Sequence, residues 1–383
     1  MLESLGRLLT QSPIRRERAA GIDALRGALA LWVVLAHLVP WTTLVQGPEG
    51  APAILQGLSQ FLTTLFQPNA ELHPAVLGFI ALSGYCVHRA GFRGSVGDLK
   101  GYGITRAFRI LPCLFTATAF GVLAWQAVSD VSPSLARTLT GTQSIEIDCL
   151  LAKLSTLAAI VPSYHPCSYA GNAPLATVMV ETTLYVSYAV LFMSIWGGYA
   201  FILPVVCGVS WVAALAVATA AKSNPLLYNW WQNSSLWGFL PYWWLGAILL
   251  HSRVESALRR RWPVIGAAWI ALTVWLWFGA GNALVSEIRK AVFCFLVGRV
   301  ILHLDRSAVS GSNPLSILGR PSYSLYAFAA PVTYTLAILG APWWVNLTTA
   351  ILVGCAAYLA IERPMMALGR MIRASESAGY VRS

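Results

Sequence analysis

Charged side chains are scarce in this sequence, and the short motifs that identify many soluble enzymes are missing. Only 11% of the 383 residues are charged, whereas 57% are hydrophobic. The sequence contains no GxSxG nucleophile elbow, no Walker-type phosphate loop, no GxGxxG dinucleotide loop and no HExxH zinc motif. These absences argue against an α/β hydrolase, a nucleotide-driven pump, a dinucleotide-dependent dehydrogenase and a zinc protease. The composition is that of a helical membrane protein.

Cysteines and basic residues narrow the field further. The seven cysteines form no CxxC pair and no other metal-ligand spacing, so we predict no metal site. Cys149 and Cys167 flank a short apolar segment on the predicted outer face, where a disulfide is permitted, although free thiols are slightly favoured. The net charge of +11 comes from basic residues that cluster between hydrophobic segments. They indicate membrane orientation rather than nucleic-acid binding.

Apolar segments predict an all-α, polytopic transmembrane bundle of about ten spans. Loop 42–73 contains no lysine or arginine, whereas loop 252–263 contains four arginines, so both termini are predicted to be cytoplasmic. We therefore divide the chain into a basic leader (1–20), a transmembrane domain (21–364) and a cytoplasmic tail (365–383). The predicted spans are residues 24–41, 74–91, 108–128, 174–196, 200–221, 236–251, 264–281, 288–303, 322–340 and 344–361.

Two long connections, 46–73 and 129–174, lie on the outer face in this topology. Leu150–Val161 within the second is apolar but too short to cross a membrane, so we interpret it as a re-entrant or interfacial segment. Loops of this length are long for a compact helical bundle. They are candidates for holding an acceptor substrate.

The first predicted span carries Arg26 and, eleven residues later, His37. At 100° per residue the two side chains leave nearly the same helix face, about 16 Å apart along the axis. A lone arginine of this kind is usually an interfacial anchor, and a lone histidine usually bonds a neighbouring helix. Their shared face favours function, with His37 as a proton acceptor near neutral pH.

Further polar residues recur inside or beside later spans. Glu181 is predicted to orient His37, the alternative being a structural ion pair. Arg106 and Arg109 lie three residues apart and suit a phosphate or pyrophosphate, the alternative being lipid headgroups. Ser83 and Gly84 are small residues that permit close helix approach, and Ser83 is a weaker candidate nucleophile. Arg89 ends the second span and is a candidate for the cytoplasmic group of cations.

At this point the pattern resembles the acyltransferase-3 family of integral membrane acyltransferases, which O-acylate cell-surface and secreted glycans. The resemblance rests on motifs in the same order along most of the chain, including Glu181 and Tyr185 in register. Two departures from the pattern stand out. Ala329 occupies the position of a late histidine, and Ala176 and Thr183 stand where the pattern has tryptophan and glutamine around the glutamate. The matching segments are GIDALRGALALWVVLAHLVPW, FIALSGYCVHR, RAFR, APLATVMVETTLY, GRPSYSLYAFAAPV and IERP.

The resemblance implies an O-acyltransferase that uses acetyl-CoA, or another acyl-CoA, from the cytoplasm. The acceptor is then a hydroxyl of an extracytoplasmic polysaccharide, lipopolysaccharide or glycolipid. His37 and Glu181 become the catalytic residues, with His37 as general base or as transient acyl carrier.

In this interpretation Arg26, Arg106 and Arg109 bind the donor, while Ser83, Arg89 and Tyr185 contact substrate. Its partners are acyl-CoA, the glycan acceptor and membrane lipids, with no nucleic acid and no metal. The expected location is a bacterial inner membrane. From a different class, the alternative is a proton-coupled transporter or flippase, because intramembrane Arg, His and Glu also build proton relays.

Overall fold

The structure is a computed structural model that describes residues 13–67, 72–90, 99–155, 157–161, 168–189, 199–220, 225–250, 252–279 and 283–380. All regular elements in these ranges are helical, which confirms the all-α prediction. The elements are α2 (Pro13–Gln46), η1 (Pro48–Gly50), α3 (Ala53–Phe66), α4 (Pro74–Ala90), α5 (Leu99–Val131), α6 (Pro133–Thr140), α7 (Ile147–Lys153), α8 (Leu157–Ile160), η3 (Ser168–Gly171), α9 (Leu175–Tyr188), α10 (Tyr199–Ala220), α11 (Pro225–Ser234), α12 (Leu236–Ile248), α13 (Ser252–Phe278), α14 (Ala283–Leu304), α15 (Pro314–Gly319), α16 (Ser322–Ile338), α17 (Trp343–Ala357), the π-helical η6 (Tyr358–Glu362) and α18 (Arg363–Tyr380).

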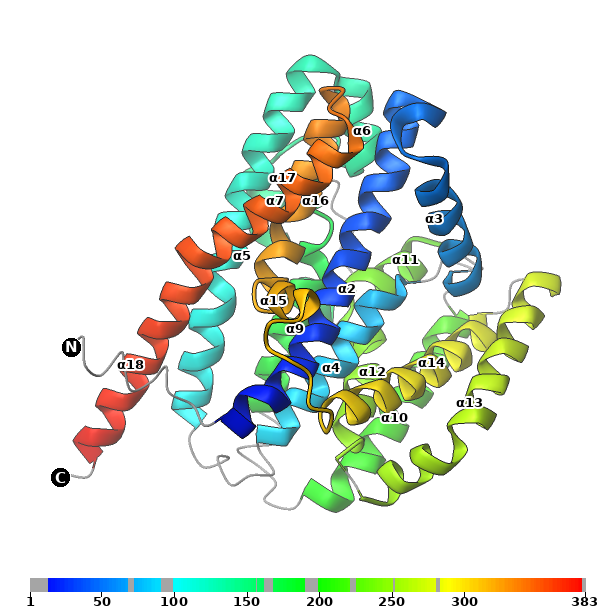
Figure 1. The fold of residues 1–383 in the computed structure, drawn as a ribbon, viewed down its shortest axis with the longest axis vertical. Coiled ribbons are helices and arrows are strands. Elements are labelled where there is room, and N and C mark those ends of the chain that lie inside the picture. The colour runs from blue at the N-terminus through cyan, green and yellow to red at the C-terminus, as the bar shows by residue number, and fades with distance from the viewer. Residues whose placement is uncertain are drawn as a thin grey trace.

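Helix α2 lies in the middle of this bundle (Figure 1). It packs against α15 and α16 and also contacts α4, α14 and α17. Its buried residues on these contacts are small or aliphatic, such as Ala30, Val34 and Leu38, all at most 1% exposed. The helix that carries Arg26 and His37 is therefore held on several sides by other helices.

Four of the described helical segments are long and apolar enough to cross a membrane: Ala20–Gln46, Leu99–Val131, Ser252–Phe278 and Trp343–Ser375. Some other apolar helices are shorter than their predicted spans, among them α4, α12 and α16. Helix α12 has 13 residues, against the roughly 20 that cross a hydrocarbon core. Its apolar character reflects burial in the protein, because Trp243 and Trp244 are at most 1% exposed. The described residues thus support a membrane bundle with four helices long and apolar enough to span it, while ten spans and cytoplasmic termini stay a prediction.

Close packing of α4 on α12 depends on glycine. A Cβ added at Gly84 would lie 1.9 Å from the Trp243 carbonyl oxygen, and one at Gly246 would lie 1.9 Å from the Ala81 oxygen. Neither distance leaves room for a side chain. The prediction that small residues beside Ser83 permit close helix approach is confirmed, and this packing brings Trp243 against Ser83.

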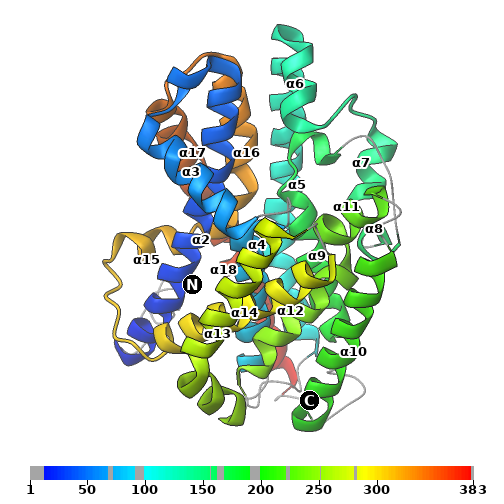
Figure 2. The same cartoon turned by 90° about the vertical axis from the view of Figure 1, so that its right-hand side faces the viewer.

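The predicted connections and tail contain more helix than expected. Residues 46–73 include α3, and residues 150–161 contribute to the short helices α7 and α8 rather than to one spanning helix. Figure 2 shows α3 beside α2, with α7, α8 and α11 on another side of the bundle.

Cys149 is disulfide-bonded, so it is not the free thiol we favoured. Cys167 lies outside the described residues, as do residues 1–12 of the leader and 190–196 of the fourth predicted span.

Candidate active site

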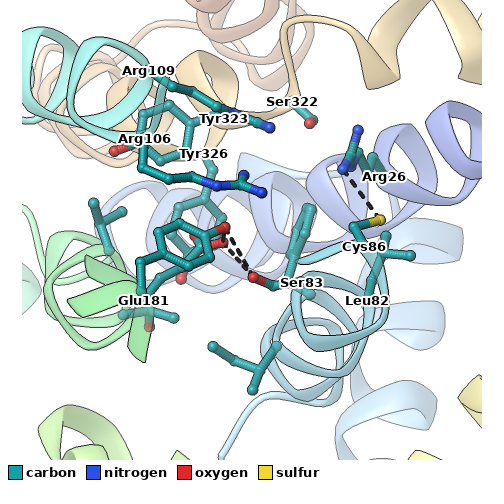
Figure 3. Close-up of a pocket in the computed structure, with 15 residues that line it drawn as sticks. Arg26, Leu82, Ser83, Cys86, Arg106, Arg109, Glu181, Ser322, Tyr323 and Tyr326 are labelled. Atoms are coloured by element: carbon teal, nitrogen blue, oxygen red, sulfur yellow. Dashed lines mark hydrogen bonds between the residues drawn. The ribbon is translucent and has the colours of Figure 1, made fainter. Parts of the chain in front are cut away.

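Three predicted donor-binding arginines line one cavity of about 150 Å³. Arg26 comes from α2, and Arg106 and Arg109 come from α5, and all three are labelled in Figure 3. Arg26 pairs with Asp23 at 3.3 Å and donates to the Cys86 sulfur at 3.6 Å. The structure therefore brings together guanidinium groups from two helices that are far apart in the sequence, and we call this space the arginine cavity.

Aromatic rings and acids hold these arginines in place. The Arg106 guanidinium lies over the Tyr185 ring at 4.7 Å and over the Tyr102 ring at 5.6 Å. The carboxylates of Glu362 and Glu181 act electrostatically on the Arg109 guanidinium. Cation–π stacking positions a guanidinium plane while leaving its N–H donors available. The cavity is thus suited to a phosphate-bearing ligand.

Glu181 also lines the arginine cavity, but its partners differ from the predicted one. Ser83 Oγ donates to Glu181 Oε1 at 2.8 Å, and the Tyr185 hydroxyl donates to the same oxygen. Trp243 Nε1 in turn donates to Ser83 Oγ at 3.4 Å. Glu181 therefore belongs with Ser83, labelled beside it in Figure 3, and with Tyr185. It does not line the cavity that holds His37. The predicted orienting contact between Glu181 and His37 is not formed.

His37 lines a larger cavity of about 660 Å³, which we call the His37 chamber. Its Nδ1 lies 2.8 Å from the Val33 carbonyl oxygen, four residues earlier in α2. Because a carbonyl only accepts, Nδ1 carries the proton, and the neutral ring has its lone pair on Nε2. The ring also packs edge-on against Trp41 at 4.8 Å. The His37 ring is therefore oriented by its own helix, and Nε2 is the nitrogen that can accept a proton.

Both long connections contribute to the wall of the His37 chamber. Gln67 and His73 come from the first, and Gly141, Lys153 and Tyr169 come from the second. The wall is rich in hydrogen-bonding groups, as a site for a hydroxylated ligand requires. Burial lowers the pKa of Lys153, whose ammonium lies 5.8 Å from the Tyr169 ring centroid.

The arginine cavity and the His37 chamber adjoin each other. Thr177 of α9 and Tyr326 of α16 line both. These two residues therefore form part of the wall between the arginine cavity and the His37 chamber. Arg89 stands apart from this arrangement. It pairs with Asp305, which also accepts from Tyr85 at 3.0 Å, so it joins α4 to the end of α14 and is absent from the lining of the arginine cavity.

Comparison with known proteins agrees with this geometry. The family model described as an acyltransferase domain, that of the acyltransferase-3 family, matches residues 19–361. This chain belongs to the acyltransferase-3 family. The acyltransferase is also 26% identical over 316 residues to the exopolysaccharide production protein ExoZ of Rhizobium meliloti (strain 1021). That match covers 77% of this chain and 90% of ExoZ. No solved structure matches the chain significantly.

Several site residues of the acyltransferase escaped the sequence reasoning. Tyr323 and Tyr326 line the arginine cavity, and the motif SYSLY was the only signal for them. Glu362 is 2% exposed, and its Oε2 accepts from Ser324 Oγ at 2.6 Å and from Ser324 N at 3.3 Å. Glu362 belongs to the IERP segment, which was its signal in the sequence, but its π-helical turn, a distortion often found at functional sites, has none. Within the described ranges, no three His, Cys, Asp or Glu side chains gather as metal ligands would.

Proposed function

We propose that this acyltransferase moves an acetyl or other short acyl group from cytoplasmic acyl-CoA to a hydroxyl of an extracytoplasmic polysaccharide, lipopolysaccharide or glycolipid. The observation that carries the proposal is the contact between the two cavities at Thr177 and Tyr326. It sets a cavity lined by three arginines beside a polar chamber that contains the proposed base. The similarity to a protein named for exopolysaccharide production supports a glycan acceptor.

Donor binding is assigned to the arginine cavity. Arg26, Arg106 and Arg109 would hold the phosphate groups of CoA through charge-assisted hydrogen bonds. Glu181 holds the hydroxyl groups of Ser83 and Tyr185 at the same cavity, where they would contact the donor. The thioester end then passes Thr177 and Tyr326 and reaches His37.

His37 acts as the general base in this proposal. The acceptor hydroxyl oxygen attacks the thioester carbonyl carbon, so a C–O bond forms, the C–S bond breaks, and Nε2 of His37 takes the hydroxyl proton. The Val33 carbonyl holds Nδ1–H and stabilises the imidazolium that forms. His37 then returns the proton to the departing CoA thiolate, so the products are an ester and a free thiol. Transient acylation of Nε2 is the alternative route.

The proposed topology has about ten spans with both termini in the cytoplasm of a bacterium and the chain in its inner membrane. The arginine cavity then faces the donor side, and the His37 chamber faces the outside. A disulfide at Cys149 agrees with this orientation, because disulfides persist outside the reducing cytoplasm. The helices shorter than a span would cross the membrane together with their flanking connections.

Mass spectrometry of surface glycans tests the proposal. Cells that carry the wild-type chain should add the mass of one acyl group, and cells that carry His37→Ala at equal membrane abundance should not. Purified protein should release one free thiol for each acyl group transferred. Transport of a glycan without thiol release would favour a transporter or flippase, and unchanged acylation by His37→Ala would contradict the role of His37.

A further inference from the structure

An apolar groove follows α2 on the side that α3 covers. Its volume is about 260 Å³, and hydrophobic residues of both helices form most of its wall. On α2 it extends from Ala28 to Val39, roughly 16 Å at 1.5 Å per residue. Leu58 of α3 lines the groove and is nevertheless 47% exposed, so the groove is open along this helix. We call it the α2–α3 groove.

Polar groups stand where the α2–α3 groove meets the His37 chamber. Ala36, Thr63, Gln67 and His73 line both spaces. His73 Nδ1 accepts from the Ala75 N–H at 3.3 Å, so the proton of the neutral ring lies on Nε2, which is a donor. Burial, with a smaller effect of His37, lowers the pKa of His73 to about 3 and keeps the ring neutral. The apolar groove thus continues into a polar chamber across a hydrogen-bonding boundary.

The backbone adds to this boundary. Pro40 lies inside α2 and has no N–H, so the Ala36 carbonyl loses its helical donor. Ala36 is one of the four residues at the boundary. A long apolar space that leads into a polar space matches an amphiphile, with a hydrocarbon tail and a hydroxylated head.

The arginine cavity reaches the chamber by a different route. It adjoins the chamber at Thr177 and Tyr326, whereas the α2–α3 groove shares no lining residue with the arginine cavity. Two ligands can therefore approach His37 without competing for the same space. Since the cationic route suits the phosphate groups of the donor, the apolar route remains for the acceptor.

We infer that the α2–α3 groove holds the hydrocarbon tail of a glycolipid acceptor, whose sugar head then lies in the chamber beside His37. This inference rests on the proposed function, and it selects a lipid-linked acceptor over a free polysaccharide. Moving a tail from the bilayer into an apolar groove changes little hydrophobic free energy. Binding of the tail in the α2–α3 groove instead raises the local concentration of the sugar head group at His37.

The test compares one head group with and without its tail. The wild-type protein, in phosphatidylcholine vesicles, receives radiolabelled acetyl-CoA and a chloroform–methanol glycolipid extract of cells that carry His37→Ala, whose acceptor hydroxyls are not acylated. A second sample receives the same glycans after mild acid has removed the lipid. We expect at least tenfold more label per mole of glycan on the lipid-linked form.

Two tryptophan variants of α3 test the groove itself. Ser59→Trp adds a large ring to the groove, whereas Ile54→Trp places it on an 80% exposed position outside the groove. Ser59→Trp should lower labelling of the lipid-linked acceptor at least tenfold and leave the slow reaction of the tail-free glycan unchanged, and Ile54→Trp should alter neither. Ala28→Phe fills the groove from α2 and replaces Ser59→Trp if that variant does not elute as a folded protein.

Equal labelling of both acceptors, together with full activity of Ser59→Trp, would overturn the inference. The inference would also be overturned if Ser59→Trp kept its activity with acetyl-CoA and lost only its activity with octanoyl-CoA. The groove would then hold the acyl chain of the donor. Failure of the proposed function looks different. Wild-type protein would then release no thiol and label neither acceptor.

Discussion

Replacing His37 with asparagine separates the orientation of this residue from its chemistry. In the structure Nδ1–H donates to the Val33 carbonyl at 2.8 Å, and Nε2 is the proposed base. The side-chain amide N–H that His37→Asn introduces can make the same bond to Val33, but nothing then replaces Nε2. General base catalysis contributes about 10² to 10⁴ in rate, which is about 2.7 to 5.4 kcal/mol in activation free energy. We expect kcat to fall by that factor.

The other properties of His37→Asn should stay close to wild type. The KM for acetyl-CoA should change little, because the arginines that we assign to the donor line a different cavity. His37→Ala is the matched control, since it removes the bond to Val33 as well as the base, and a lost hydrogen bond costs about 1 kcal/mol of stability. Thiol release by protein in vesicles measures both kinetic constants, and the thermal midpoint measures folding.

Three results decide between the mechanisms. A His37→Asn enzyme within threefold of the wild-type kcat refutes the role of His37 as base. A rate of zero, combined with an acyl group on His37 in acid-quenched wild-type protein, identifies the acyl carrier instead. General base catalysis requires that His37→Asn keep a low but measurable rate, more than threefold below the wild-type kcat, and that no acylated protein form.

Three other predictions concern Arg106, Glu181 and Lys290. Arg106→Lys should raise the KM for acetyl-CoA about tenfold with a smaller change in kcat, because lysine lacks the guanidinium fork that binds phosphate and stacks on Tyr185; steady-state thiol release checks it. Glu181→Gln should leave the pH dependence of kcat unchanged, because Glu181 accepts hydrogen bonds from Ser83 and Tyr185 and not from His37. A shifted pH profile would instead indicate that Glu181 interacts with His37, as predicted from the sequence. Lys290→Met should cost about 3 to 5 kcal/mol of stability because it leaves Glu287, 1% exposed, without its cation. The double variant Glu287→Gln/Lys290→Met should recover much of the thermal midpoint.

Local periodicity was enough to predict several parts of the site. The spacing of Arg26 and His37 puts both on one side of α2, and the structure indeed places each in one of two adjoining cavities. The three-residue spacing of Arg106 and Arg109 likewise brings both into one cavity. These predictions succeed because they depend on the geometry of one helix. Helix geometry is the same wherever the helix packs.

Contacts between helices were not predictable in the same way. Glu181 and His37 lie at comparable depths in their predicted spans, but their meeting depends on the rotation and position of two separate helices. Nδ1 of His37 is already bonded within α2, and Glu181 is bonded from α4 and by its own helix. The span count has a related difficulty, because hydropathy does not distinguish residues facing lipid from residues buried in protein, as in α12.

Helix α2 links the parts of the proposed mechanism. It contributes Arg26 to the arginine cavity, His37 to the chamber and the residues from Ala28 to Val39 to the α2–α3 groove. Donor, base and acceptor tail would therefore all be positioned by one rigid element, with about 16 Å between the phosphate-binding end and the base. The close approach of Gly319 on α15, where a Cβ would lie 1.7 Å from the Asp23 carbonyl oxygen, fixes α2 beside Arg26. Because a rotation of α2 would move all three sites together, tight packing here sets the relative geometry of the donor, base and acceptor sites that we propose.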